Sequence, residues 1–307
     1  YASTINEEVF YDTYHRNIGS LEILLDCDNT IISTSTESDI LHCLQVILGC
    51  DATFMSNLQK NLLLDTCNNQ FKHTFCSVGC GGGKSMGWVI PMVRQILMGQ
   101  RPKMSIVIVP YCFLLDHHIS SCASILGHCN RISIAALKGS NIESNEKPFI
   151  LRDIRLLPSI LFVSLEGIAK LVEFHFEYMK ELMETQSVFK IYLDECHTVL
   201  SELSFRKKYV SLKKLAALKV PVVSFSGSFQ QSFVNGYMNY MFGSTKEEMF
   251  NYVIDADLFG KKLLRIQHNA SNNYIENGCD FVLDFMKTNP NDNIHIIVST
   301  KKEGKYD

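Results

Sequence analysis

Short runs of apolar and β-branched residues recur along the chain and alternate with stretches in which apolar positions repeat at helical spacing. A continuous apolar run of this kind is typical of a parallel strand that is buried on both faces. The runs that we interpret as strands are 73–78, 105–109, 132–137, 160–164, 188–193 and 222–225. Helices are predicted near 40–48 and 58–63, from 86 onward, and over 166–184 and 206–218. The alternation predicts an α/β fold, a mostly parallel sheet with helices on both faces.

The same pattern divides the chain into three parts. Residues 1–39 show no clear periodicity and are treated as an N-terminal extension without an assigned function. Residues 40–260 hold the alternating strands and helices. Residues 261–307 begin with a basic and polar stretch and continue with one helical and one strand pattern, which we interpret as a linker and the truncated start of a second α/β domain. Because the chain opens on Tyr1 rather than Met, we expect it to be a fragment of a longer protein.

The composition narrows the class of protein. The 307 residues are 46% hydrophobic and 20% charged, which is typical of a globular protein. The net charge of −3 excludes nucleic-acid binding through bulk positive charge, so such binding must depend on the local placement of Lys and Arg. No uncharged apolar run reaches roughly 18 residues, and no signal peptide opens the chain, so no membrane partner is expected.

The eleven cysteines are an odd number and are scattered from Cys27 to Cys279. None forms a C-x-x-C pair, and a disulfide framework or a zinc site would need better spacing. We interpret them as reduced, mostly buried thiols of a cytosolic or nuclear protein and expect no zinc site. A metal site among these cysteines is the alternative. Cys76 and Cys80, separated by three residues, lie at the mouth of a glycine-rich stretch.

The first candidate for chemistry is the glycine-rich stretch 78–85, which follows one predicted strand and precedes a helix. This is the layout of a phosphate-binding P-loop, in which glycines turn several N–H groups toward one anion at a helix N-terminus. Lys84 would bind the terminal phosphates and Ser85 would bind Mg²⁺. In the pattern G-x-x-x-x-G-K-[ST] the first glycine falls on Val78, so an ordinary turn is the alternative. The residues predicted to hold the nucleotide in this stretch are Gly81, Gly82, Gly83, Lys84 and Ser85.

The second candidate is the acidic pair Asp194 and Glu195, which ends the predicted strand 188–193. Downstream of a P-loop, one carboxylate of such a pair holds Mg²⁺ and the next orients and partly deprotonates the attacking water. A plain loop is the alternative for the pair by itself. Its combination with the P-loop indicates a site for a nucleoside triphosphate.

A third group of polar residues lies close to the acidic pair in sequence or at a neighbouring strand end. His197 is either a polar core residue or a relay between the nucleotide and the rest of the domain. Ser226 and Ser228, after the strand 222–225, are its expected hydrogen-bond partners, and an ordinary turn is their alternative interpretation.

In combination these motifs resemble those of superfamily 2 helicases, and within them the RecQ-like group, over about residues 40–300. Cys80–Ser85 is similar to the T-G-G-G-K-S loop of that group, which also lacks the first glycine, with Cys80 as a departure. Asp194–His197 is similar to a D-E-x-H box, and Phe205–Tyr209 matches F-R-x-x-Y. The D-E-C-H spelling is closest to RecQ-like helicases of fungal subtelomeres and mobile elements. By the same resemblance, Gln59 would read the adenine.

The resemblance also implies contacts with the nucleic acid. The residues at the matching positions are Pro110, Ser164, Glu166, Phe205 and Arg206. The loop 198–204 is shorter than its counterpart in the group and has no aromatic residue, and Gly227 replaces the Ala of the S/T-A-T motif. Four lysines of the segment 206–218 are further candidates by charge, although a solvated helix face is the alternative: Lys207, Lys208, Lys213 and Lys214.

The leading hypothesis is the first RecA-like, ATP-binding domain of a nuclear DNA helicase that uses ATP and Mg²⁺ and acts on single-stranded or fork-like DNA. The resemblance implies that arginines of a second RecA-like domain complete hydrolysis, so the fragment is expected to bind ATP weakly and hydrolyse little. One alternative is a degenerate helicase remnant that only binds nucleic acid or partners. Another is a small-molecule P-loop kinase, which does not account for Phe205 and Arg206.

Overall fold

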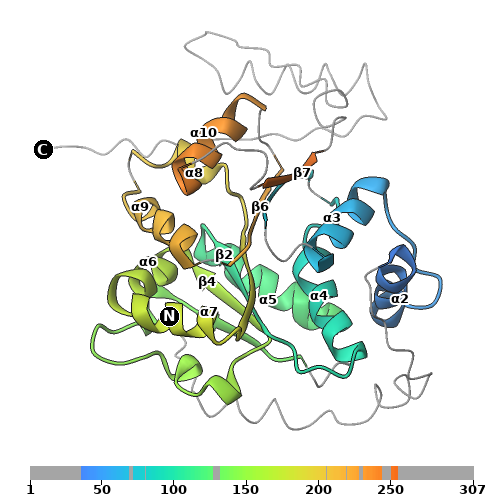
Figure 1. The fold of residues 1–307 in the computed structure, drawn as a ribbon, viewed down its shortest axis with the longest axis horizontal. Helices are drawn as coiled ribbons and strands as arrows, with labels where there is room; N and C mark the ends of the chain where they lie inside the picture. The colour runs from blue at the N-terminus through green and yellow to red at the C-terminus, as the bar shows by residue number, and fades with distance from the viewer. Residues whose placement is uncertain are drawn as a thin grey trace, which may run out of the picture. The chain divides into compact units, whose positions relative to one another are not determined.

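The computed structural model describes residues 36–68, 72–79, 81–126, 132–204, 206–218, 220–227, 231–243 and 250–254. Strands and helices alternate along these residues, as the apolar pattern predicts (Figure 1). The strands are β1 His73–Ser77, β2 Met104–Val109, β3 Ile134–Leu137, β4 Ile160–Ser164, β5 Val188–Leu193, β6 Val222–Ser226 and β7 Phe250–Ile254. The expectations for residues 1–35 and 261–307 lie outside the described residues, and the proposed domain boundaries stay predictions.

The strands of the described part form one seven-stranded parallel sheet in the order β3-β4-β2-β5-β6-β1-β7. The predicted fold class is therefore confirmed. Since every strand runs the same way, all their carboxyl ends lie along one edge, where ligands of open α/β sheets bind. β1 pairs with β6 and not with β2, its neighbour in sequence, so the loops after β1, β5 and β6 lie side by side.

Helices cover both faces of the sheet (Figure 1). On one face lie α2 Glu37–Leu48, α3 Asn57–Asn68, α4 Met86–Leu97 and α5 Cys112–Leu126. On the other face lie α6 Leu165–Phe174, α7 Phe176–Glu184, α8 Thr198–Ser201, α9 Tyr209–Leu212 and α10 Gln231–Phe242. Short 3-10 turns are η1 Gly139–Asn141, η2 Phe149–Leu151, η3 Ile154–Leu156 and η4 Lys213–Leu218. The sequence analysis did not identify α5, α10 or β7.

Residues of β2 show why its apolar run is continuous. Ile106 and Ile108 pack into the core on one face, and Val107 and Val109 pack into the core on the other. All four side chains are fully buried. A strand with helices packed on both faces of its sheet has no polar face, so its residues form a continuous apolar run in the sequence.

Two predicted helices differ from the structure. The expected helix over 166–184 is two helices, α6 and α7, separated by His175, whose Nε2 lies 2.8 Å from the carbonyl oxygen of Glu143. The expected helix over 206–218 is the four-residue α9 followed by η4. In that segment the buried side chains recur every third residue, which suits the three-residue turn of a 3-10 helix: Tyr209, Leu212, Leu215 and Leu218.

Within the described residues, no helix is long and apolar enough to cross a membrane. The cysteines of this part are free thiols and mostly buried. No cluster of three or more His, Cys, Asp or Glu side chains that could hold a metal ion occurs among the residues that the structure describes.

Lys190 joins the sheet to α3 from a fully buried position on β5. Its ammonium donates a hydrogen bond of 2.6 Å to the carbonyl oxygen of Thr66, in the last turn of α3. Carbonyl groups there lack partners within the helix, and a cation at a helix C-terminus is favourable. Burial lowers the pKa of Lys190 from 10.5 to about 8.

This pKa shift predicts a specific pH dependence of stability. Between about pH 8 and 10.5 the folded protein has released the Lys190 proton while the unfolded chain still holds it, so the free energy of unfolding rises with pH. Over that range we expect the free energy of unfolding of the wild type to rise by up to about 3 kcal/mol relative to that of Lys190→Met. Denaturant titrations of both proteins from pH 7.5 to 10.5 would measure this gain. The exposed Lys180→Met variant is the control, and a constant difference between wild type and Lys190→Met would contradict the assignment.

Candidate functional site

The glycine loop connects β1 to α4 at the carboxyl edge of the sheet. Gly81 and Gly83 have φ of 77° and 79°, the left-handed region that favours glycine. A Cβ on Gly82 would lie 2.5 Å from Cγ1 of Val78, so the fully buried Val78 side chain packs directly under the loop. Cys80 lies outside the described residues. The positive φ angles are those expected of a loop that turns its backbone around a ligand.

Gln59 of α3 packs against this loop. A Cβ on Gly83 would lie only 2.3 Å from Nε2 of Gln59, so glycine is required for this close approach. The Gln59 side chain is 2% exposed, and its Oε1 accepts a hydrogen bond of 2.7 Å from the backbone N–H of Met55. The structure therefore brings the predicted base-reading residue and the predicted phosphate loop together, although they lie on separate elements.

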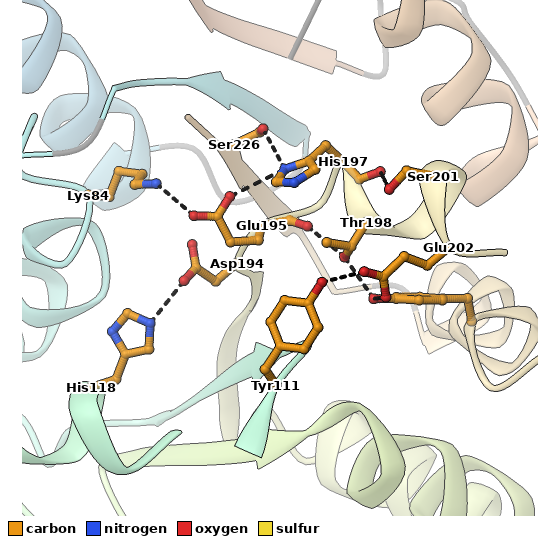
Figure 2. Close-up of polar contacts among 11 residues, drawn as sticks. Lys84, Tyr111, His118, Asp194, Glu195, His197, Thr198, Ser201, Glu202 and Ser226 are labelled. Carbon is orange, nitrogen blue, oxygen red and sulfur yellow. Dashed lines mark hydrogen bonds and ion pairs between the residues drawn. The ribbon is translucent and has the colours of Figure 1, made fainter. Parts of the chain in front are cut away.

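Lys84 lies opposite the acidic pair that follows β5 (Figure 2). Its Nζ is 3.4 Å from Oε1 of Glu195. The hydroxyl group of Ser85, at the start of α4, makes no capping hydrogen bond with that helix. Phosphate oxygens placed in the loop would compete with Glu195 for the Lys84 ammonium.

Asp194 has one occupied and one unoccupied carboxylate oxygen. Oδ2 lies 2.9 Å from Nε2 of His118, on α5 (Figure 2). Oδ1 is buried and has no hydrogen-bond partner among the described residues. A buried carboxylate oxygen without a donor is costly unless a cation satisfies it. The arrangement therefore fits Mg²⁺, a hard cation that prefers oxygen ligands.

Glu195 is held in a strained backbone conformation with φ of 45°, which is uncommon for a residue other than glycine. The hydrogen bonds that hold it lie on either side of its peptide. Thr198 Oγ1 donates to the carbonyl oxygen of Glu195 at 2.8 Å, and the N–H of Cys196 donates to the carbonyl oxygen of Phe225 at 2.8 Å. The strain is thus supported from both α8 and β6.

His197 joins the acidic pair to β6. Its Nδ1 lies 3.3 Å from Oε2 of Glu195 and 3.1 Å from the hydroxyl oxygen of Ser226, so one ring nitrogen contacts both groups (Figure 2). The hydrogen bond from His197, with a further contribution from Lys84, lowers the pKa of Glu195 and keeps its carboxylate ionised. The expected contact between His197 and Ser226 is present, whereas Ser228 lies outside the described residues.

His118 was not identified in the sequence because nothing in a helical stretch indicates which strand it faces. Its ring stacks on Phe162 with centroids 6.0 Å apart and meets the edge or face of Trp88 at 5.5 Å. Trp88, fully buried on α4, also contacts Tyr192 and Phe225 at 6.1 and 5.5 Å between centroids. This aromatic cluster below the site fixes where His118 presents its Nε2 to Asp194.

The structure describes four of the five residues predicted to contact nucleic acid. Arg206 donates from Nη1 to the carbonyl oxygen of Pro110 at 3.0 Å, so these two lie together. Glu166 lies 3.8 Å from Nζ of Lys208. Ser164 differs from the expectation, because its side chain is fully buried and its hydroxyl accepts a hydrogen bond from the N–H of Gly167 as the cap of α6. Its side chain is therefore not at the surface, and Phe205 lies outside the described residues.

The sequence was compared with models of protein families and with curated protein sequences. Residues 56–235, more than half of the chain, match the family described as DEAD/DEAH box helicase. No curated protein sequence matches the chain.

Solved structures show the same fold. One is Mss116p bound to ssRNA and AMP-PNP, with a TM-score of 0.53, 12% identity, and coverage of 86% of this chain and 55% of that one. Another is the DUF1998 helicase MrfA bound to DNA, with a TM-score of 0.51, 15% identity, and coverage of 72% and 30%. The chain spans only about a third to a half of the length of the solved structures at the head of the comparison.

The family match contains the glycine loop, the acidic pair and His197, and it ends after β6 and the Ser226 contact. The sheet order, the site at its carboxyl edge and this match agree with one another. The chain belongs to the DEAD/DEAH box helicase family, and its described residues form a helicase ATP-binding domain of superfamily 2.

Proposed function

We propose that this domain binds ATP with Mg²⁺ and that the protein uses ATP hydrolysis to move along and unwind DNA, as a nuclear, RecQ-like member of its family. The observation that carries the proposal is the meeting of the glycine loop, Lys84, Asp194 and Glu195 at one sheet edge. A residue that touches the loop from a separate helix, Gln59, adds a place for the base. A structural domain without a ligand would have no need of Glu195 in a strained conformation beside Lys84.

The chemistry follows from the charges in place. Lys84 would release Glu195 and bind the phosphates, which frees the Glu195 carboxylate to accept a proton from an attacking water. Its lowered pKa keeps that carboxylate ionised at neutral pH. His197 then holds Glu195 in position through Nδ1 and connects it to Ser226 on β6.

Asp194 and Ser85 are the residues that would hold Mg²⁺. The ion would neutralise phosphate charge as the phosphoryl group is transferred. His118 fixes the Asp194 carboxylate through Oδ2, so Oδ1 would be available to hold the ion.

DNA is proposed as the polynucleotide because of the F-R-x-x-Y motif and its contact with Pro110. Among proteins of the same fold, MrfA was solved with DNA and Mss116 with ssRNA, so both polynucleotides belong in the test. Arginines of a second domain would complete hydrolysis, and an arginine of this kind contributes about 10³ to 10⁵ in rate.

The proposal predicts ATPase activity of the full-length protein that single-stranded DNA stimulates more than single-stranded RNA. Lys84→Ala should lower stimulated turnover by about 10² or more, because it removes a preorganised charge. Steady-state phosphate release measures both effects. Lys180→Ala, at an exposed position of α7, is the control. Stimulation by neither polynucleotide would refute the helicase assignment, and RNA preference would refute the choice of DNA.

The degenerate-remnant alternative is motivated by Cys80, by Gly227 and by the segment 198–204, which has no aromatic residue. Thermal unfolding of the 307-residue chain with ATP and Mg²⁺ separates it from the leading proposal. An intact site gains about 2.7 kcal/mol at a hundredfold excess of ligand over its dissociation constant. A remnant would show no Mg²⁺-dependent shift in Tm.

Two glycine substitutions test how the loop and the base site are linked. Gly81→Ala and Gly83→Ala each force alanine into the left-handed region at about 1–2 kcal/mol, but only the Cβ at Gly83 displaces Gln59. We expect Gly83→Ala to weaken ATP binding by about tenfold more than Gly81→Ala. Calorimetric titration measures the affinities. Adding Gln59→Ala should cost Gly83→Ala little further affinity, and full additivity would contradict the link.

His118 can be tested through its effect on Mg²⁺. Since it positions Asp194 and does not touch the nucleotide loop, His118→Ala should raise the Mg²⁺ concentration needed for tight ATP binding by about tenfold or more. ATP binding without Mg²⁺ should stay unchanged, and His118→Gln should restore part of the loss. The exposed neighbour His117→Ala is the control. A loss of ATP binding that is the same with and without Mg²⁺ would indicate a structural role only.

A further inference from the structure

An aromatic pair lies just after β2, at the carboxyl edge that holds the nucleotide site. The rings of Tyr111 and Phe113 are stacked, with centroids 5.6 Å apart and planes within 14° of parallel. The Arg206 guanidinium lies over the Tyr111 ring at 4.9 Å from its centroid. Planar groups are thus gathered at one point from two segments far apart in sequence.

Phe113 is 69% exposed although it lies in the first turn of a well-formed helix, α5. No ring contact of Phe113 other than that with Tyr111 is present among the described residues. Placing this much aromatic surface in water is unfavourable and adds nothing to the core. The exposed ring therefore has a free surface on which another planar group could stack.

The ring below Phe113 is firmly positioned. The hydroxyl group of Tyr111 donates a hydrogen bond to Glu202, and this bond raises the pKa of Tyr111 to about 12, so the hydroxyl remains a donor (Figure 2). Glu202 also pairs with Nη1 of Arg206 at 3.2 Å. Arg206 in turn donates to the carbonyl oxygen of Pro110, so the stack is held by the backbone directly after β2. A platform that is ordered before binding loses little entropy when a ligand stacks on it.

We propose that Phe113, supported by Tyr111 and Arg206, is a stacking site for an unpaired base of a single-stranded nucleic acid. Every base has a π face, so an aromatic platform of this kind accepts bases of any sequence. Arg206 and its neighbour in sequence, Lys207, are cations that would attract the phosphates on either side of the stacked base. The segment 198–204, whose first four residues form α8, joins the same network through Glu202 and has no aromatic residue that could serve instead. This inference rests on the proposed function, because it identifies how the domain holds its polynucleotide.

The same residues connect this stacking site to Glu195. Oε2 of Glu202 lies 3.5 Å from the hydroxyl group of Tyr209, which donates to Thr198 Oγ1 at 2.7 Å. Thr198 Oγ1 then donates to the carbonyl oxygen of Glu195. The stacking site and the strained residue of the proposed nucleotide site therefore belong to one network of contacts.

The test compares two fluorescent oligomers of equal length, oligo-dT and an abasic deoxyribose-phosphate strand, by anisotropy with the 307-residue chain. The wild type should bind oligo-dT more tightly. Phe113→Ala should weaken binding to oligo-dT by about 5- to 100-fold, the range for loss of one base stack. Binding to the abasic strand should stay unchanged, and Phe113→Trp should retain the preference for oligo-dT. The salt dependence of oligo-dT binding should keep its slope in Phe113→Ala, because no phosphate contact is removed.

Phe149→Ala is the matched control, since Phe149 is also exposed, at 57%, and also has a guanidinium over its ring, that of Arg152 at 5.8 Å. It should bind both strands like the wild type. Equal weakening of both strands by Phe113→Ala, or no weakening of either, would overturn the stacking site while leaving the proposed function intact. If the wild type binds neither strand nor single-stranded RNA, the proposed function fails as well.

Discussion

Backbone hydrogen bonds that continue past the strand ends are the interactions on which the site depends. The N–H of Val78 donates to the carbonyl oxygen of Ser226 at 2.9 Å, and the N–H of Asp194 donates to that of Ile108 at 2.9 Å. The N–H of Cys196 bonds to Phe225 in the same way. These bonds join the entry of the glycine loop, the acidic pair and the end of β6 into one unit. The side chains of these segments are held in position because their backbone is hydrogen-bonded to a buried parallel sheet.

The polar side chains of this unit contact one another in the absence of a ligand. Lys84 is paired with Glu195, Glu195 with His197, and Asp194 with His118. The exception is Oδ1 of Asp194, which is buried without a donor among the described residues. The phosphates of ATP would pair with Lys84, which now contacts Glu195 at 3.4 Å. Mg²⁺ would pair with Oδ1 of Asp194, which has no partner among the described residues.

The network on the other side of Glu195 leads to the proposed stacking site. Contacts of Thr198, Tyr209 and Glu202 connect the strained peptide to Tyr111, whose ring stacks on the exposed Phe113. The proposed nucleotide site and the proposed stacking site are thus neighbours that meet at the acidic pair. Coupling through such a boundary needs only small shifts, because packed side chains have few alternative positions.

Local pattern determined much of this protein. Continuous apolar runs predicted β2, β4, β5 and β6 to within a residue. Glycines before Lys84 and carboxylates after a strand indicated the two segments that the structure brings together in the proposed nucleotide site. Tertiary structure alone decided which strand ends are neighbours, and hence that His118 meets Asp194 and that Tyr111 meets Glu202. The physical reason is that buried positions recur with the period of a helix or strand and can be recognised in the sequence. A contact between residues 76 or 91 positions apart depends on strand order and register, which the sequence pattern does not indicate.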